Sequence, residues 1–180
     1  MMLLDADRSQ LLVVDVQARL LPAMSEPEAV LASGRILLAA AGELGLPVTV
    51  SEQYPAGLGQ TVPELVPPPG TEVLAKTEFS CLRNRAIAER LAGLDRPQLV
   101  ILGIEAHVCV LQTVVQAVAE GFTPCVVADG IASRRRENRD LGLARMRAAG
   151  ATVISTEMAV FEWLGSASAP AFRTLSRLVR

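Results

Sequence analysis

One stretch of the sequence decides the fold class: Leu99-Val100-Ile101-Leu102-Gly103-Ile104-Glu105-Ala106-His107-Val108-Cys109-Val110. An apolar run of strand length ends at a glycine, a short polar turn follows, and Cys109 then opens a helical pattern. Because the N-terminus of a helix favours negative charge, a thiol in this position is expected to have a lowered pKa and to be a good nucleophile. The same pattern also fits a small buried cysteine that packs beneath a helix, so both interpretations stay open at this point.

Strand-like and helix-like segments alternate along the rest of the chain. Strands are expected at residues 10–14, 47–50, 72–75, 98–102, 124–128 and 152–154, and helices at 26–44, 84–92, 107–120, 137–149, 157–164 and 171–179, with Ser25 as the N-cap of the first helix. Strands that are apolar throughout and alternate with helices indicate a parallel sheet covered on both faces. The sequence therefore predicts an α/β protein: a three-layer α/β/α Rossmann-like fold with a six-stranded parallel sheet, formed by residues 1–180 as a single domain.

Composition and charge narrow the class of protein further. A chain of 180 residues, of which 51% are hydrophobic, is long enough for one domain with a substantial core. The net charge of -2 argues against nucleic acid as a partner, and no apolar run is long enough to span a membrane. Residues 1–7 carry acids where a signal peptide needs bases, and three irregularly spaced cysteines do not make a disulfide framework. We therefore expect a cytoplasmic protein with reduced thiols.

Motif counts exclude two common kinds of site. His107 is the single histidine of the chain, so a zinc site built on several histidines is excluded. The sequence contains neither a P-loop nor a Gly-x-Gly-x-x-Gly motif, so nothing in it indicates a nucleotide site.

Reactive side chains follow three of the expected strands. Asp15 follows the first strand, Lys76 the third and Cys109 the fourth. Open α/β sheets bind ligands at the carboxyl ends of their strands, and the first and fourth strands are neighbours if the strand order reverses beside the first. In that arrangement Cys109 is the nucleophile, Asp15 the general base, and Lys76 the positive charge that keeps Asp15 ionised. Taken singly, an aspartate at a strand end often caps a turn and a lysine is usually a solvated surface charge.

The order of these motifs resembles that of a known superfamily, the isochorismatase-like cysteine hydrolases. The pattern of that superfamily has an apolar strand ending in Asp-x-Gln, then a Lys followed by an aromatic-Ser pair, then Gly-apolar-x-x-x-x-Cys-Val, and later a strand ending in Asp. The matching segments here are residues 13–17, 76–80, 103–110 and 126–130. Residues 52–65 and 103–109 are most similar to the isochorismatase domain-containing subgroup.

The resemblance implies a catalytic triad of Asp15, Lys76 and Cys109. It also implies a cis peptide bond between Ile104 and Glu105, which in this superfamily aims backbone N–H groups into an oxyanion hole. Backbone N–H groups around Glu105 and Cys109 are accordingly expected to bind the oxyanion that forms on an attacked carbonyl.

The sequence also departs from two activities of the superfamily. Nicotinamidases hold a metal with one Asp and two His on the loop after the second strand, and residues 51–54 contain no histidine, so neither a metal nor a cofactor is expected. Beyond Lys76 no cationic cluster follows an expected strand, so an acidic chorismate-type substrate is not expected either. Gln17, Tyr54 and Phe79 are the candidates for lining a substrate pocket, and a plain core role fits Phe79 equally well.

Several residues near the motifs keep two interpretations. Glu105 either disfavours anionic substrates or points away and caps the helix start, and capping is the favoured one. His107 is either a substrate or subunit contact or an ordinary side chain at the helix start. Cys81 and Cys125 have no partner groups in the motifs and are expected to be structural.

The sequence as a whole favours a hydrolase of a small molecule. It would attack an amide, a related C–N bond or an activated carbonyl through a covalent intermediate on Cys109. A catalytically idle binding or scaffold protein is the alternative, and a redox sensor that uses Cys109 with Cys81 is a weaker one. The family resemblance also implies a homo-oligomer, with Phe161, Trp163 and Leu164 as interface candidates unless they pack on their own sheet.

Overall fold

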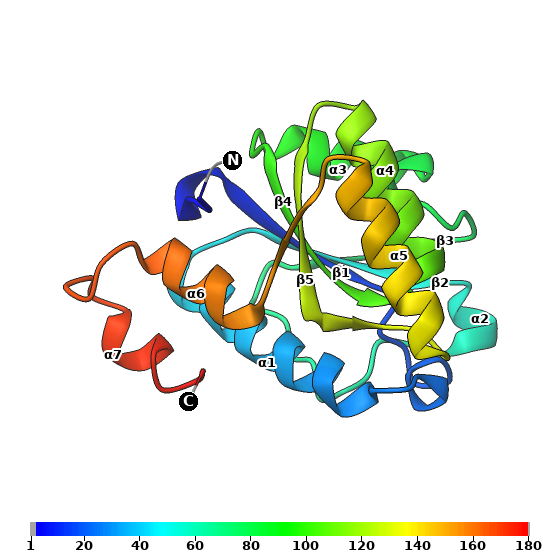
Figure 1. Ribbon diagram of the computed structural model, residues 1–180, viewed down its shortest axis with the longest axis horizontal. Helices are drawn as coiled ribbons and strands as arrows, with labels where there is room; N and C mark the ends of the chain where they lie inside the picture. Colours follow the sequence, from blue (N-terminus) through cyan, green and yellow to red (C-terminus); the bar gives the residue numbers. More distant parts are fainter. Residues whose placement is uncertain (1–2, 180) are drawn as a thin grey trace.

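A parallel sheet at the centre of the molecule positions all the other elements. The computed structural model describes residues 3–179, in which six parallel strands form one sheet in the order β3-β2-β1-β4-β5-β6 (Figure 1). The strands are β1 (Ser9–Val14), β2 (Val48–Gln53), β3 (Glu72–Lys76), β4 (Gln98–Ile104), β5 (Thr123–Ala132) and β6 (Thr152–Ile154). All the expected strands are present, and the predicted α/β class is confirmed.

Helices cover both faces of this sheet. The longer helices α1 and α6 pack on one face and α3, α4 and α5 on the other, which confirms the three-layer α/β/α arrangement (Figure 1). The helices are α1 (Pro27–Leu44), α2 (Pro55–Leu58), α3 (Arg85–Gly93), α4 (Leu111–Ala119), α5 (Arg136–Ala148), α6 (Thr156–Leu164) and α7 (Phe172–Leu175). Short turns complete the chain: the 3-10 turns η1 (Ala6–Arg8), η2 (Leu21–Ala23) and η3 (Cys81–Arg83), and the π-helical turn η4 (Ala106–Val110).

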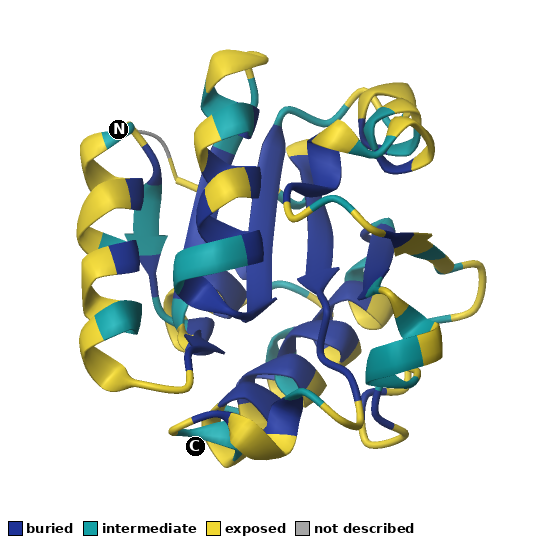
Figure 2. Cartoon of the chain, turned by 90° about the vertical axis from the view of Figure 1, so that its right-hand side faces the viewer, coloured by how far each residue is buried: buried dark blue, intermediate teal, exposed yellow. Residues whose placement is uncertain are grey.

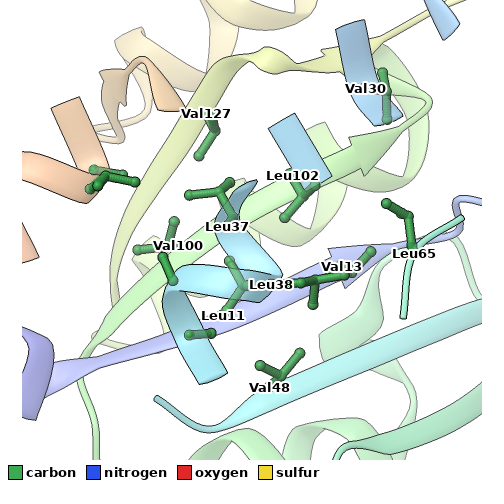
Figure 3. Close-up of a cluster of buried hydrophobic side chains, with 14 of the residues drawn as sticks. Leu11, Val13, Val30, Leu37, Leu38, Val48, Leu65, Val100, Leu102 and Val127 are labelled. Atoms are coloured by element: carbon green, nitrogen blue, oxygen red, sulfur yellow. The ribbon is translucent and has the colours of Figure 1, made fainter. Parts of the chain in front are cut away.

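The apolar side chains of the strands contribute to two separate hydrophobic cores. Alternate side chains of a strand point to opposite faces, so Leu11 and Val13 of β1 join the core beneath α1, whereas Leu12 and Val14 join the core beneath α4. Figure 3 shows Leu37 of α1 among the strand side chains of the first core. Figure 2 shows the central strands as buried throughout while the outward faces of the helices are exposed. Burial on both faces explains why these strands are apolar without alternation.

The strand order reverses beside β1, which lies between β2 and β4. At the carboxyl end of the sheet Val14 pairs in register with Ser51 of β2 and with Gly103 of β4. One strand further out, Gln53 pairs with Lys76. The segments that follow β1, β3 and β4 therefore leave the sheet at one edge, which is where open α/β sheets place their ligand sites.

Two local expectations about element ends were wrong. The N-cap of α1 is Glu26 rather than Ser25, because the Ser25 hydroxyl donates instead to the carbonyl of Ser133 at 2.9 Å. Strand β5 continues beyond Asp129, whose carboxylate accepts from the N–H of Thr156 at the start of α6 at 2.8 Å. In both places a hydrogen bond between segments distant in sequence determines the local geometry.

The end of the chain is less helical than its sequence pattern predicts. Within the expected helix at 171–179, only Phe172–Leu175 is α-helical. Of the interface candidates, Trp163 and Leu164 are buried in the core of their own sheet, whereas Phe161 is 40% exposed. The packing alternative therefore holds for Trp163 and Leu164.

At Gly103 of β4 the backbone of β1 lies too close to leave room for a side chain. Its φ is +127°, and a Cβ atom there would overlap the carbonyl oxygen of Val14 and lie 2.7 Å from its nitrogen. Only glycine combines this φ with this proximity.

We expect Gly103→Ala to lower the free energy of unfolding by about 3 kcal/mol, because the added methyl group meets rigid strand backbone. Chemical denaturation measures the loss. Gly93→Ala is the matched control, since nothing lies within 4 Å of its Cβ position and its φ is not positive. A control that loses as much stability as Gly103→Ala would contradict this account.

Candidate active site

A buried ion pair joins two of the three candidate residues. Asp15 follows β1 with a φ of +54°, and Lys76 is the last residue of β3. The ammonium of Lys76 lies 2.7 Å from Asp15 Oδ2, and both side chains are fully shielded from solvent. A carboxylate and an ammonium are tolerated at such depth because each compensates the charge of the other.

Further hydrogen bonds fix both members of the pair. Lys76 Nζ also lies 2.6 Å from Gln53 Oε1 and 3.2 Å from the carbonyl oxygens of Glu78 and Phe79. With Asp15 Oδ2 these make four acceptors for the three N–H bonds of the ammonium, so Lys76 has no N–H bond left for a further partner. The other oxygen of the carboxylate, Asp15 Oδ1, accepts from the Ser51 hydroxyl at 2.7 Å.

Cys109 completes the constellation from the far side of β1. It lies in the π-helical turn η4, is 5% exposed, and is within hydrogen-bonding reach of the Asp15 carboxylate. The carbonyl of Glu105 accepts from Val108 and Val110 in this turn, at 3.0 and 3.3 Å. The peptide bond between Ile104 and Glu105 is cis, as the resemblance implied.

The pKa of the Cys109 thiol is raised, which corrects the expectation from its place at a helix start. Burial is the largest cause, the negative charge of Asp15 adds to it, and the positive charge of Lys76 only partly opposes it. The thiol is therefore neutral near physiological pH, and a nearby base has to take its proton before it becomes a nucleophile.

Burial and ion pairing have opposite effects on the pKa values of Asp15 and Lys76. Burial raises the pKa of Asp15 above its ordinary value, against the lowering effects of Lys76 and Ser51. Burial lowers the pKa of Lys76, but the charge of Asp15 and the nearby thiols outweigh it, so that pKa is raised as well. Lys76 therefore stays protonated, while Asp15 has a greater affinity for a proton than an exposed carboxylate.

The side chain of Glu105 does not cap the helix start. Glu105 occupies the N-cap position of η4 without a side-chain cap hydrogen bond. Its carboxylate accepts instead from the backbone N–H and the Nε of Arg134, both at 3.1 Å. His107 lies beside this pair, with Nδ1 2.9 Å from the Ser133 hydroxyl and Nε2 3.4 Å from Asn138. These contacts tie the turn before Cys109 to the end of β5.

The three residues expected to line a substrate pocket differ in exposure and in hydrogen bonding. Gln17 is buried, and its amide donates to the carbonyls of Gln53 and Gly59 at 3.0 and 2.6 Å, so both N–H bonds are used to hold the loop after β2. Tyr54 and Phe79 are 57% and 54% exposed, so neither has a plain core role. The Tyr54 ring lies over Gly57, where an added Cβ would overlap it.

Three residues that contact the ion pair or its neighbours were not predicted from the sequence. Ser51 and Gln53 each bind one half of the pair, and Cys81 is hydrogen-bonded to Ser51 through its thiol at 3.5 Å. Cys81, expected to be merely structural, therefore lies next to the site. The only signal in the sequence was the spacing of Ser51 and Gln53 two residues apart on one strand, which becomes meaningful once the strand order is known.

The described residues contain neither a metal-binding cluster nor a membrane-spanning helix. Within residues 3–179 no group of three or more His, Cys, Asp or Glu side chains is arranged to hold a metal ion. No helix in the same range is both long and apolar enough to cross a membrane. All three cysteines are free.

Comparison with known proteins identifies the family of this chain. The family described as Isochorismatase domain matches residues 9–158. The chain belongs to the isochorismatase family. Isochorismatase domain-containing protein 1 of Salmo salar is 37% identical over 167 residues, which cover 92% of this chain and 59% of that protein. This chain thus spans well under two thirds of the length of that relative.

Solved structures share the fold over nearly the whole chain. A structure of MAR1 ribonuclease from Caenorhabditis elegans has a TM-score of 0.94 at 31% identity and covers 99% of this chain and 92% of its own. YcaC from Pseudomonas aeruginosa has a TM-score of 0.84 at 25% identity and covers 98% of this chain and 95% of its own.

We expect Lys76→Met to lower the free energy of unfolding by about 3–5 kcal/mol at about pH 8, because the Asp15 carboxylate is left buried without a cation. Without Lys76 the pKa of Asp15 rises further, so the carboxyl is protonated and the loss shrinks as the pH falls toward about 5. Denaturation at several pH values measures this trend.

The double variant Asp15→Asn/Lys76→Met is expected to recover part of the stability, since it buries no charge. Arg85→Ala is the control, because it removes an ion pair with Glu89 that is mostly exposed. A loss for Lys76→Met that stays constant with pH would contradict the assigned role of the buried charge.

Proposed function

We propose that this protein is a cysteine hydrolase that cleaves an amide, a related C–N bond or an activated carbonyl bond of a small molecule, with Cys109 as nucleophile, Asp15 as general base and Lys76 as the charge that keeps Asp15 ionised. The observation that carries this proposal is the buried 2.7 Å Asp15–Lys76 pair, with which the buried Cys109 thiol interacts. Family membership supports hydrolase chemistry in general.

The first half of the proposed reaction forms a covalent intermediate. Cys109 Sγ attacks the carbonyl carbon as its proton passes to Asp15, and the π electron pair moves onto the carbonyl oxygen. Backbone N–H groups of the turn that includes Ile104, Glu105 and Cys109 would bind the resulting oxyanion. Asp15 then gives its proton to the leaving nitrogen as the C–N bond breaks, and a thioester remains on Cys109.

The second half releases the acid product. Asp15 accepts a proton from a water molecule, whose oxygen attacks the thioester carbon. The C–S bond breaks, the thiolate takes the proton back from Asp15, and the resting thiol is restored. Lys76 stays protonated throughout and balances the charge of Asp15 in the steps in which Asp15 is ionised. No cofactor takes part.

Exposed aromatic side chains and the charge balance favour a small molecule as substrate. Tyr54 and Phe79 follow β2 and β3 at the same edge of the sheet and offer apolar contact. The P. aeruginosa YcaC structure is described with covalent acrylamide, a small amide, which supports a screen of compounds of this size. The ribonuclease name belongs to the C. elegans structure, and the net charge of -2 argues against an RNA substrate for this chain.

The proposal is tested by a screen of small amides and carbamoyl compounds, with intact mass used to detect an acylated protein. Cys109→Ala is expected to abolish acylation, and Asp15→Asn is expected to slow turnover by about 100-fold or more because general base catalysis is lost. Cys125→Ala is the matched control and is expected to react like the wild type, since this thiol is buried in the opposite core.

Acylation that persists in Cys109→Ala would contradict the proposed nucleophile. A folded wild-type protein that reacts with none of the compounds and whose Cys109 is no more reactive toward iodoacetamide than Cys125 would favour a binding or scaffold protein.

A further inference from the structure

Strand β2 directs two polar side chains to the same face, beneath the ion pair. Ser51 and Gln53 are two residues apart on this strand, so they point the same way. Ser51 donates to Asp15 Oδ1 at 2.7 Å, and Gln53 accepts from Lys76 at 2.6 Å. Because β2 lies between β1 and β3, one strand reaches both members of the pair. Ser51 is completely buried, so its hydroxyl has to find its partners within the protein.

The Cys81 thiol donates to the Ser51 hydroxyl and so supports its hydrogen bond to Asp15. Cys81 Sγ lies 3.5 Å from Ser51 Oγ and donates its S–H to it. Since an accepting hydroxyl oxygen has its own hydrogen left to give, the hydrogen of Ser51 is directed to Asp15 Oδ1. Cys81 is itself completely buried. The Cys81 thiol therefore supports the base through Ser51 rather than by contact with a substrate.

The backbone of the same cysteine is connected to the nucleophile. The N–H of Cys81 donates to Thr113 Oγ1 at 2.9 Å, and the Thr113 hydroxyl donates to the carbonyl oxygen of Cys109 at 2.7 Å. Cys81 of turn η3 is thus connected to Asp15 through Ser51 and to Cys109 through Thr113. Such a connection fixes the distance between base and nucleophile.

We propose that Ser51 is a positioning residue of this site, whose hydroxyl, directed by Cys81, holds Asp15 Oδ1 so that the carboxylate faces the Cys109 thiol. This inference rests on the proposed function, in which Asp15 takes the proton of Cys109. Each carboxylate oxygen has a second lone pair, so Asp15 accepts from Ser51 and Lys76 and still has room for that proton.

The hydrogen bond from Ser51 also affects the charge state of the base. Asp15 is faced by Lys76 from β3, Cys81 from η3 and Cys109 from η4, and the hydrogen bonds from Ser51 and Lys76 stabilise its ionised form against the effect of burial. Removal of the Ser51 hydroxyl therefore raises the pKa of Asp15. At any given pH on the acid side, Asp15 is then protonated in a larger fraction of the molecules. A protonated carboxyl cannot accept the thiol proton.

The experiment is the pH dependence of Cys109 alkylation by iodoacetamide, with Cys109 resolved from Cys81 and Cys125 by peptide mass. The wild type is expected to lose reactivity as Asp15 becomes protonated. In Ser51→Ala this loss is expected about one pH unit higher, which corresponds to about tenfold slower alkylation on the acid side. Ser51→Thr keeps the hydroxyl and is expected to restore the wild-type profile.

Ser9→Ala is the matched control for loss of a buried hydroxyl. Ser9 is fully buried at the start of β1, at the opposite end of the sheet, and donates to Gln98 Oε1 at 2.8 Å. It is expected to cost similar stability in thermal unfolding and to leave the pH profile unchanged. If Ser51→Ala does not fold, Cys81→Ala is the second variant, with a smaller shift expected in the same direction.

Asp15→Asn separates failure of the inference from failure of the proposed function. If this variant removes the inflection that Asp15 causes and leaves only the titration of the thiol itself, while Ser51→Ala, or Cys81→Ala in its place, behaves like the wild type, Ser51 is not a positioning residue and the base assignment stands. If Asp15→Asn keeps the wild-type profile, Asp15 is not the base and the proposed function fails with the inference.

Discussion

The buried ion pair between Asp15 and Lys76 is the constraint on which the arrangement of the surrounding residues depends. Neither charge is tolerated alone at this depth, so the residues that reach it satisfy one member or the other. Ser51 binds the carboxylate, while Gln53 and two carbonyls bind the ammonium. The left-handed backbone of Asp15 turns the chain away from the sheet just where this carboxylate is needed.

Much of the fold could be predicted because its strands are buried on both faces. An apolar run such as that of β4 has one stable place in an α/β protein, the interior of a parallel sheet. The carboxyl ends of those strands share one edge, so Asp15, Lys76 and Cys109 could be assigned to one neighbourhood from sequence position. Element ends were less predictable, because Ser25 and Asp129 bind partners more than 25 residues away.

The electrostatic details of the site could not be predicted from the sequence. The local backbone at a helix start favours a lowered thiol pKa, but burial and the charge of Asp15 act more strongly on Cys109 and raise it. The sequence places Glu105 at the N-cap position before Cys109. Its carboxylate instead accepts hydrogen bonds from Arg134, which follows another strand. The contact of Cys81 with the site could not be predicted, since its partners Ser51 and Thr113 come from different elements.

The segment Ser51-Glu52-Gln53 has a consequence for how the sheet assembles. Glu52 points away from the ion pair and accepts from the N–H and hydroxyl of Thr61, at 2.6 and 2.8 Å. A slip of β2 by one residue would exchange the two faces of the strand and bring the Glu52 carboxylate toward Asp15. Two carboxylates at that depth repel each other, so the misaligned sheet is penalised by the same charge that the aligned sheet uses. The residues of the site therefore also help the chain to select the correct strand pairing.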